Sequence, residues 1–408
     1  QASLIRNFLT KSRLKFLTND FSIKRKIKDS LSSENKPNVV FILIESMSAS
    51  FMSEFGNEEK ITPFLDSISN QSLFFKNLYA TGNRTVRGME AVTLSIPPTP
   101  GQSIVKRPNN SNLYTISNVF KSKNYKCNFF YGGDGYFDNM NAFYGGNGFD
   151  IYDRGRGSIL SDAIKTTRHN IDDKEVTFEN AWGICDEDIY NKMIKVADEY
   201  HQKKKPFLNF VMTTSNHRPY TYPENEIDIP SGTGRNGAVK YSDYALQQMF
   251  AKAKNKPWFK NTIFVFVADH CASSAGKDEI DVKNYQIPAI IYGQNLIKPQ
   301  RVTKLCSQID VFPTLFGQLH WSYTSNFFGT NVLSNNYKER ALIGTYLKLA
   351  CKTNNNVMIL SNQKNNSNYT WNSVSNHLKV VPMNKSKLNE TIAWYQAADY
   401  LYLNAKLK

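Results

Sequence analysis

Five short runs of apolar residues constrain the fold of this chain most strongly. Each run is the length of a strand, and each is apolar at nearly every position rather than at alternate ones. That pattern is typical of strands buried on both faces of a parallel sheet. The runs are Asn38 to Glu45, Cys127 to Tyr131, Phe207 to Thr213, Thr262 to Ala268 and Ile287 to Tyr292.

Helical patterns separate these runs. One covers Thr62 to Ser69, where Thr62 can cap the helix and Pro63 suits its first position. Another covers Asp186 to His201 and opens with three acidic residues, which complement the helix dipole. A third covers Tyr241 to Lys254. Alternating strands and helices predict an α/β fold, with a mostly parallel sheet between two layers of helices.

The two ends of the chain have a different character. Residues 1–36 are basic and loosely amphipathic, which predicts either a connector or a segment packed on the surface. Residues 37–340 hold all five apolar runs and form the predicted catalytic domain. Residues 341–408 contain an Asn-rich stretch, 352–376, predicted as a hairpin, and a helical pattern over 387–403. We expect them to form a small C-terminal subdomain.

The net charge of +15 favours an anionic partner: nucleic acid, an anionic membrane or a phosphate-bearing substrate. Lys and Arg are scattered along the chain, which argues against a nucleic-acid binder.

The five cysteines include no CxxC pair, so a zinc ribbon is excluded and buried free thiols are expected. The best apolar run, Val39 to Ile44, is too short to span a bilayer. There is no signal peptide, and the start at Gln1 suggests an excised fragment.

Two of the apolar runs end in residues that bind metals. The first ends at Glu45 and the fourth is followed by Asp269 and His270. Ligands of open α/β sheets gather at the carboxyl ends of the strands, so these side chains are candidate ligands of one site. Either strand end alone would as readily cap a helix, but the two together favour a metal site.

Two loops add candidate catalytic groups. The segment Thr81 to Glu90 contains a glycine and leads into a helical pattern that starts at Thr85. A hydroxyl at a helix N-terminus suits attack on phosphorus when a cation lowers its pKa, although alone it would be a capping threonine. Arg84 and Arg87 flank it and could hold a phosphate. His217, in a polar loop after the third run, could donate to a leaving oxygen.

These motifs occur in an order that resembles the sulfatase-like family. The series is Asn38 to Glu45, Thr62-Pro63, the Thr85 loop, Ser215 to His217, Ala268 to His270, and Ile309 to Thr314. More closely, residues 37 to about 350 resemble the extracytoplasmic domain of lipoteichoic acid synthases and their phosphoglycerol transferase relatives. The resemblance implies an alkaline phosphatase/sulfatase-like fold, with a central, mostly parallel sheet flanked by helices and a small C-terminal sheet.

The resemblance also implies roles for individual residues. Glu45, Thr85, Asp269 and His270 match the ligands of one divalent cation, Mn²⁺ first, with Mg²⁺ or Zn²⁺ as alternatives. Thr85 matches the nucleophile as well. It lies outside the C/S-x-P-x-R signature of true sulfatases, so conversion to formylglycine is not expected. His217 matches a histidine that contacts substrate.

One segment departs from the lipoteichoic acid synthases. Where these carry His, Trp and Arg around the glycerophosphate, this chain has Tyr131, Asp138 and Met140. The Arg that grips the phosphate is therefore absent from this segment, and Arg84, Arg87 or Arg218 could replace it. We include Tyr131, Asp138, His217 and these arginines among the predicted substrate contacts.

The leading hypothesis is a phosphoglycerol transferase. It would take an anionic phospholipid donor, act on a glycan or glycerol-type acceptor through a phospho-threonine, and work outside the cytoplasm, tethered by a missing N-terminal membrane region. A phosphoethanolamine transferase or a phosphodiesterase on the same scaffold is the first alternative, although few histidines and scattered cysteines argue against the former. A non-catalytic sensor or lipid-binding protein is the second, and a nucleic-acid binder the third.

Overall fold

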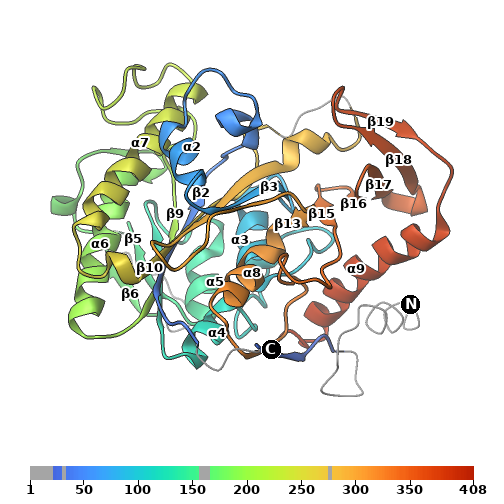
Figure 1. Ribbon diagram of the computed structural model, residues 1–408, viewed down its shortest axis with the longest axis horizontal. Coiled ribbons are helices and arrows are strands. Elements are labelled where there is room, and N and C mark those ends of the chain that lie inside the picture. Colours follow the sequence, from blue (N-terminus) through green and yellow to red (C-terminus); the bar gives the residue numbers. More distant parts are fainter. Residues whose placement is uncertain (1–21, 30–33, 156–165, 274–277) are drawn as a thin grey trace.

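The computed structural model describes residues 22–29, 34–155, 166–273 and 278–408, which form an α/β architecture around one large sheet (Figure 1). Within these residues the large sheet has ten strands. In spatial order they are β12 (Gln300–Val302), β3 (Leu73–Tyr79), β11 (Gln286–Tyr292), β10 (Thr262–Ala268), β2 (Asn38–Ile44), β9 (Phe207–Met212), β4 (Lys126–Tyr131), β5 (Asp150–Asp153) and β6 (Arg168–Asn170), with β13 (Cys306–Ser307) also beside β3.

The centre of this sheet is parallel and completely buried. Strands β10, β2, β9 and β4 run parallel to one another, whereas β11 is antiparallel to both β10 and β3. The sheet is therefore mixed, with parallel pairs in the majority. All five predicted apolar runs are strands of this sheet, and each boundary agrees within one residue. Strand β3 was not predicted from the sequence.

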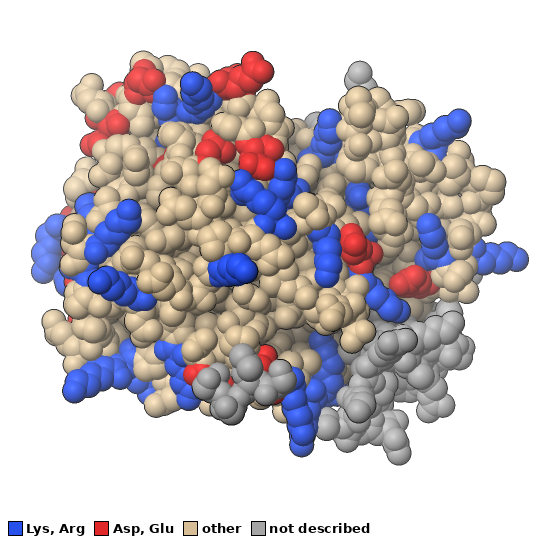
Figure 2. Space-filling model, in the orientation of Figure 1, with Lys and Arg blue, Asp and Glu red and all other residues tan. Residues whose placement is uncertain are grey.

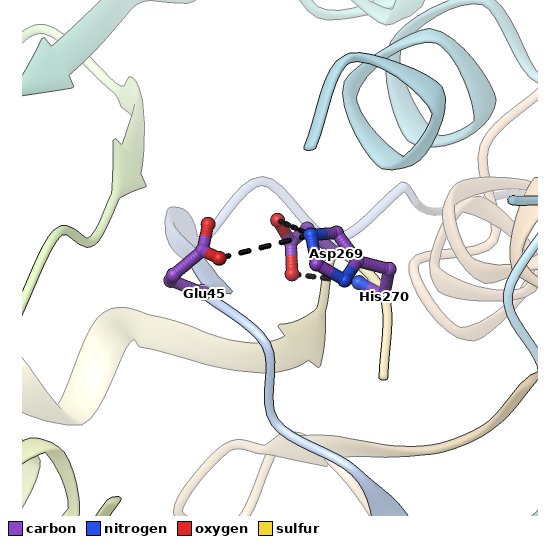
Figure 3. A group of neighbouring side chains, drawn as sticks. All are labelled: Glu45, Asp269 and His270. Atoms are coloured by element: carbon purple, nitrogen blue, oxygen red, sulfur yellow. Dashed lines mark hydrogen bonds and ion pairs between the residues drawn. The ribbon is translucent and has the colours of Figure 1, made fainter. Parts of the chain in front are cut away.

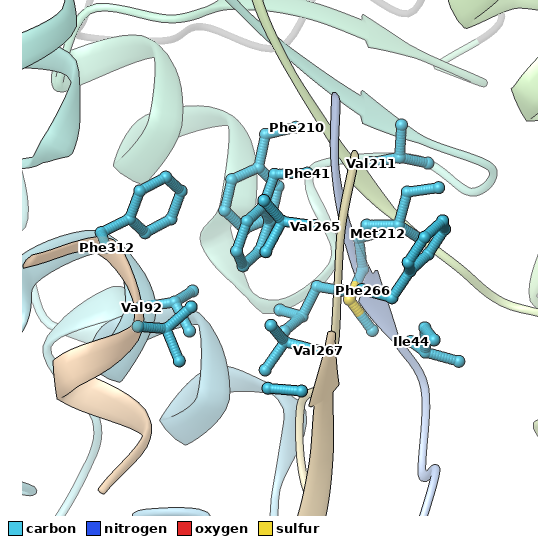
Figure 4. Packing of buried hydrophobic residues seen from close by; sticks show 14 of the residues in the cluster. Phe41, Ile44, Val92, Phe210, Val211, Met212, Val265, Phe266, Val267 and Phe312 are labelled. Carbon is cyan, nitrogen blue, oxygen red and sulfur yellow. The ribbon is translucent and has the colours of Figure 1, made fainter. Parts of the chain in front are cut away.

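Helices cover both faces of the sheet (Figure 1). The helices are α2 (Pro63–Ser69), α3 (Thr85–Leu94), α4 (Ile116–Ser122), α5 (Met140–Gly146), α6 (Asp186–Gln202), α7 (Arg235–Lys254), α8 (Val311–Gln318) and α9 (Lys385–Leu403). On one face, Phe41 of β2 stacks on Phe312 of α8 with ring centroids 4.6 Å apart (Figure 4). On the other face, Phe266 of β10 meets Phe64 of α2 edge-on at 5.9 Å. The core therefore has two layers, one on each side of the central strands.

The start of α2 differs from the prediction. The Thr62 hydroxyl does not cap the helix and instead donates to Asp66 Oδ2 at 3.0 Å. The cap comes from α7, where the carboxylate of Asp243 accepts hydrogen bonds from the backbone N–H groups of Phe64 (2.8 Å) and Leu65 (2.9 Å). Helix α7 itself begins at Arg235, earlier than the predicted Tyr241.

The C-terminal part forms a separate antiparallel sheet of five strands within the described chain. Its strands are β15 (Ala341–Gly344), β16 (Leu349–Thr353), β17 (Asn356–Leu360), β18 (Ser367–Asn372) and β19 (His377–Val380). The predicted Asn-rich hairpin therefore spans β16 to β18, and α9 packs on β16 and β17. Tyr79 of β3 shares a small core with this sheet, which joins it to the large one.

Two short pairs of strands lie outside these sheets. β1 (Arg25–Ile27) pairs with β14 (Tyr323–Ser325), and β7 (Glu179–Asn180) pairs with β8 (Gly183–Ile184).

The predicted connector, residues 1–36, falls mostly outside the described residues. All five cysteines are buried free thiols, as predicted. In the part of the chain that the structure describes, every helix is too short or too polar to cross a bilayer. On the face shown in Figure 2, Lys and Arg are scattered over the surface.

Candidate active site

The carboxyl ends of β2 and β10 meet at one edge of the sheet. The two strands are parallel neighbours, and Ile44 is paired with Ala268, so Glu45 and Asp269 follow the same rung of the ladder. Glu45, Asp269 and His270 each offer a ligand atom within 4.8 Å of the others (Figure 3). The predicted convergence of these three residues therefore follows directly from the register of the two strands.

Glu45 is buried and held from several directions. Its N–H donates to Thr213 Oγ1 at 2.9 Å, and Ser46, in a left-handed conformation at φ +52°, donates through its hydroxyl to Glu45 Oε1 at 2.6 Å. His217 Nε2 lies 3.3 Å from Glu45 Oε2. Burial alone would raise the pKa of Glu45, but the hydrogen bond from His217 and the nearby charges of His270 and His217 hold it below its usual range.

Asp269 has one satisfied and one unsatisfied oxygen. Oδ1 accepts hydrogen bonds from the N–H groups of Ser46 (2.8 Å) and His270 (2.6 Å). Oδ2 is buried without a hydrogen-bond partner among the described residues. Burial and the negative charge of Glu45 raise the pKa of Asp269 well above its usual value. The two neighbouring carboxylates therefore repel each other, and a bound cation would relieve that repulsion.

His270 presents one nitrogen to the carboxylates. Its Nδ1 lies 2.7 Å from the carbonyl oxygen of Cys271, which can only accept, so Nδ1 carries the proton. Its Nε2 lies 3.4 Å from Asp269 Oδ2 and 3.7 Å from Glu45 Oε1. The two buried carboxylates, one of which has an oxygen without a hydrogen-bond partner among the described residues, and one imidazole nitrogen form a donor set that fits a divalent cation.

Thr85 lies beside these residues because the N-terminus of α3 is packed against them. The helix begins at Thr85, as predicted, and the Thr85 hydroxyl donates to Glu45 Oε2 at 3.2 Å. Gly88, in the next turn, makes this approach possible, because a Cβ at that position would lie 2.4 Å from the carbonyl oxygen of Asp269. A glycine one turn into α3 thus sets the distance between the hydroxyl and the carboxylates.

His217 is oriented from two sides. Asp186, at the start of α6, accepts hydrogen bonds from the backbone N–H groups of Thr214 and Ser215, both at 3.0 Å, and so holds the loop that carries His217. The indole of Trp182 stacks on the imidazole with centroids 4.0 Å apart. Burial lowers the pKa of His217, but the hydrogen bond and the charge of Glu45 outweigh it and raise the pKa above its usual value.

A cavity of ≈ 760 Å³ opens above Thr85, and cationic side chains dominate its charged lining. Arg84 and Arg218 are exposed at its wall. The half-buried Arg235 lies over the Tyr220 ring at 5.0 Å, and its Nη1 is buried without a hydrogen-bond partner in the described part of the chain. Such a cavity suits a phosphate-bearing substrate.

The remaining predicted substrate contacts also line this cavity, but two of them are engaged elsewhere. Arg87 donates to Glu90 Oε1 at 2.9 Å, to the carbonyl of Thr99 and to that of Gly101. Its two terminal nitrogens therefore bind α3 to the following loop, and this geometry favours a structural role. Asp138 is paired with Lys106 at 2.6 Å, which neutralises its charge. Tyr131 is buried near Glu45, and burial raises the pKa of its hydroxyl.

Among the lining residues that sequence reasoning missed are two cations, Lys106 and Arg235, and the aromatic Trp182. Lys106 ends a short helical turn after α3, Trp182 sits in the turn between β7 and β8, and Arg235 starts α7. None lies in a motif or at the end of a predicted strand. Only the folding of distant loops over the same strand ends brings them to the site, so the sequence held no local signal for them.

The sulfatase family profile matches residues 37–321. The chain belongs to the sulfatase family. It is 30% identical to a protein of the alkaline phosphatase superfamily from Vibrio parahaemolyticus, over 99% of this chain and 97% of that one, with a TM-score of 0.88. It also superimposes on the lipoteichoic acid synthase LtaP from Listeria monocytogenes with a TM-score of 0.74, at 20% identity over 99% of this chain and 98% of that one. Both matches confirm the expected fold.

Curated relatives are also enzymes of this kind by name. The chain is 25% identical over 330 residues to lipoteichoic acid synthase 2 of Bacillus subtilis, covering 74% of this chain and 48% of the relative. It is 23% identical over 317 residues to phosphoglycerol transferase I of Xanthomonas axonopodis, covering 73% of this chain and 43% of the relative. The chain thus spans about half the length of the curated relatives it matches. Members of this superfamily use a divalent metal, and Glu45, Asp269 and His270 are the described cluster that fits one.

Proposed function

We propose that this sulfatase-family chain transfers phosphoglycerol from an anionic phospholipid to a glycan or glycerol-type hydroxyl, through a phosphate ester on Thr85. The proposal rests mainly on the position of the Thr85 hydroxyl, which lies 3.2 Å from Glu45 Oε2 in a cavity lined by arginines. The residues proposed to hold the cation are Glu45, Thr85, Asp269 and His270. Mn²⁺ is the proposed ion because oxygen ligands with one imidazole suit it, with Mg²⁺ or Zn²⁺ as alternatives.

The bound cation would lower the pKa of the Thr85 hydroxyl and stabilise negative charge on the phosphate oxygens. Thr85 Oγ1 then forms a bond to phosphorus while the bond from phosphorus to the lipid alcohol breaks. The leaving oxygen takes a proton, and His217 is the acid proposed for that role, because it lines the cavity with Nε2 3.3 Å from Glu45 Oε2. In the second step the acceptor hydroxyl gives its proton to His217 and its oxygen replaces Thr85 on phosphorus. The threonine then takes back from solvent the proton that it lost in the first step. Arg84, Arg218 and Arg235 hold the phosphate.

The charges of the cavity favour glycerol over ethanolamine as the transferred headgroup. An ethanolamine ammonium needs a free carboxylate, but among the described residues that line the cavity Glu45 belongs to the proposed cation site and Asp138 is paired with Lys106. The arginines would repel an ammonium and attract the phosphate. Phosphoethanolamine transfer and simple phosphodiester hydrolysis on the same site are therefore the alternatives that the experiment must separate.

A lipid donor places this activity beside a membrane. We propose that the chain works at the outer face of a bacterial membrane, that residues 1–36 connect it to a membrane region, that 37–340 form the catalytic domain and that 341–408 form an appended subdomain. The net charge of +15 would favour an anionic membrane surface.

The test is intact-protein mass spectrometry after incubation with Mn²⁺ and phosphatidylglycerol, with phosphatidylethanolamine in parallel. We expect an adduct with the mass of glycerophosphate on the peptide that contains Thr85, and turnover reduced by at least ~10³-fold in Thr85→Ala. Thr85→Ser is the matched control, since it keeps a hydroxyl at the helix start. An adduct formed only from phosphatidylethanolamine would move the headgroup to the alternative, and a metal-loaded Thr85→Ala enzyme with normal turnover would contradict the proposal.

A further inference from the structure

Four exposed apolar side chains belong to two loops that reach the active-site cavity. Tyr136 (63% exposed), Phe137 (47%), Tyr346 (81%) and Leu347 (62%) form what we call the apolar rim. Phe137 follows β4, Tyr346 follows β15, and both line the cavity. Large apolar side chains exposed to this degree are few among the described residues, and the other four, Val374, Val380, Met383 and Leu403, all follow β18 in the chain. Two pairs from distant segments thus belong to loops that reach one cavity.

The pair Tyr346 and Leu347 forms the tip of the turn between β15 and β16. Thr345 fixes this turn: its N–H donates to the carbonyl of Lys348 at 2.8 Å, and its hydroxyl accepts from the N–H groups of Leu347 (3.2 Å) and Lys348 (2.9 Å). Turn tips normally carry Gly, Pro, Asn, Asp or Ser. The fold does not require tyrosine and leucine at the tip of this ordered turn, so their exposure points to a binding partner.

The loop with Tyr136 and Phe137 is fixed just as firmly. Asp134 accepts the N–H of Tyr136 through Oδ1 (3.0 Å) and the N–H of Phe137 through its carbonyl (2.9 Å). Asp138 (φ +52°) and Asn139 (φ +63°) follow in left-handed conformations, and Lys106 binds Asp138. Backbone of this kind persists only where the surroundings hold it. The rim therefore consists of two ordered loops that keep apolar groups in water.

The charge beside the rim indicates what covers it. Arg84 and Arg218 are exposed in the wall of the same cavity, and the chain carries a net charge of +15. Tyrosine, with an apolar ring and a polar hydroxyl, favours the level of the lipid headgroups, and cationic side chains favour an anionic leaflet. A second protein would also suit apolar groups, but it would not explain why they belong to the loops that reach the cavity a lipid must enter.

We propose that the apolar rim inserts into the headgroup layer of an anionic bilayer, so that the opening of the cavity faces the membrane. This inference rests on the proposed function, because a phospholipid donor would reach Thr85 with its acyl chains still in the leaflet. Docking of the rim shortens the distance over which the headgroup has to leave the bilayer. The rim would also select donors that are presented in a membrane over the same headgroup free in solution.

The test uses the double variant Tyr136→Ser/Leu347→Ser, because neither residue lines the cavity and the headgroup site is left intact. The matched control is Val374→Ser/Val380→Ser, which removes two exposed apolar groups of the C-terminal sheet. Sedimentation with vesicles of phosphatidylglycerol and phosphatidylcholine should show binding about tenfold weaker for the rim variant and within about twofold of the parent for the control.

Activity separates this inference from the proposed function. We expect the rim variant to need about tenfold more vesicular donor for half-maximal rate, while its rate with a short-chain, water-soluble phosphatidylglycerol stays that of the parent. If the parent turns over neither donor, the proposed function fails, and vesicle binding alone still decides the role of the rim. Equal vesicle binding by parent and rim variant overturns the inference. So does a rim variant that binds vesicles normally but needs more acceptor, since the rim would then hold the glycan.

Discussion

Asp310 and Asp269 are both fully buried carboxylates, yet the protein surrounds them in opposite ways. Asp310 receives two parallel bonds from Arg340, at 2.6 Å and 2.8 Å, and further hydrogen bonds from Tyr337, Thr330 and Ser307. Asp269 faces a second carboxylate, Glu45, and keeps one oxygen without a hydrogen-bond partner in the described structure.

The surroundings of the two carboxylates indicate a structural role for Asp310 and a ligand role for Asp269. A buried charge is tolerated when the protein itself pairs and hydrogen-bonds it, as it does around Asp310. A buried charge left short of positive partners is stable only with an added cation, or when it is protonated. Incomplete compensation therefore favours Glu45, Asp269 and His270 as the candidate cation site more strongly than burial or acidity alone.

The largest expected effect comes from breaking the compensated pair. Arg340→Met leaves Asp310 without its partner and should lower the free energy of unfolding by about 3–5 kcal/mol, measured by urea denaturation. Arg301→Met, which removes an arginine from a partly exposed pair with Glu54, is the control and should lose no more than about 1 kcal/mol. Added Mn²⁺ should not restore the stability of Arg340→Met. If Arg340→Met and Arg301→Met lost equal free energies of unfolding, the proposed difference between Asp310 and Asp269 would be contradicted.

The next largest effect is expected from Mn²⁺ binding beside Asp269, the carboxylate that lacks a positive partner. Mn²⁺ at about a hundredfold its dissociation constant should raise the free energy of unfolding by about 2.7 kcal/mol, visible as a higher Tm. Asp269→Ala should abolish this rise. Asp138→Asn is the matched control, because that carboxylate lines the same cavity but is already paired with Lys106, and it should keep the rise. A normal Mn²⁺ response in Asp269→Ala would remove Asp269 from the proposed ligand set.

A third buried charge extends the comparison to a cation. Lys352, between the rings of Tyr79 and Trp371, lies within 4.8 Å to 5.1 Å of their centres, and burial lowers its pKa to about 8 from 10.5. Between pH 8 and 10.5 the unfolded chain holds a proton that the folded chain has released, so stability rises with pH across this window. Lys352→Met should be more stable than the parent by about 1–2 kcal/mol at pH 7, since the two rings offset part of the burial.

That difference between Lys352→Met and the parent should shrink as the pH rises from 8 to 10.5, because the folded lysine is then neutral and the unfolded one is losing its proton. Thermal unfolding of both proteins from pH 7 to 10.5 measures it. A constant difference over the whole range would show that packing, rather than charge, decides the effect of the substitution.

The smallest change is expected where removal of a charge relieves repulsion. Without added cation, Asp269→Asn should leave the free energy of unfolding within about 1 kcal/mol of the parent or raise it slightly, because the carboxylate is buried beside Glu45. Asp310→Asn should instead lose about 2–3 kcal/mol, because Arg340 is left buried without a counter-charge. Denaturation in the presence of a chelator compares the two, and a loss in Asp269→Asn as large as in Asp310→Asn would mean that both carboxylates are structural.

Much of the sheet could be predicted from the residues alone. A strand buried on both faces has to be apolar throughout, so β2, β4, β9, β10 and β11 are visible in the sequence. Strand β3 was missed, although Leu73 to Phe75 and Leu78 to Tyr79 are apolar, because Lys76 and Asn77 interrupt the run. The cap of α2 was assigned to the neighbouring Thr62, because a sequence cannot show that Asp243 of a distant helix points at the same N–H groups.

The sequence by itself determined the order of the strands along the chain, the residue types at their ends and the start of α3 at Thr85, because these depend on local patterns of apolar and capping residues. Only the tertiary structure decided how the charges are compensated: that Arg87 is bound to Glu90 and two carbonyls, that Lys106 neutralises Asp138, and that Trp182 and Arg235 reach the cavity. The physical reason is that electrostatic pairing and burial depend on distances across the fold, and separation along the chain does not fix those distances.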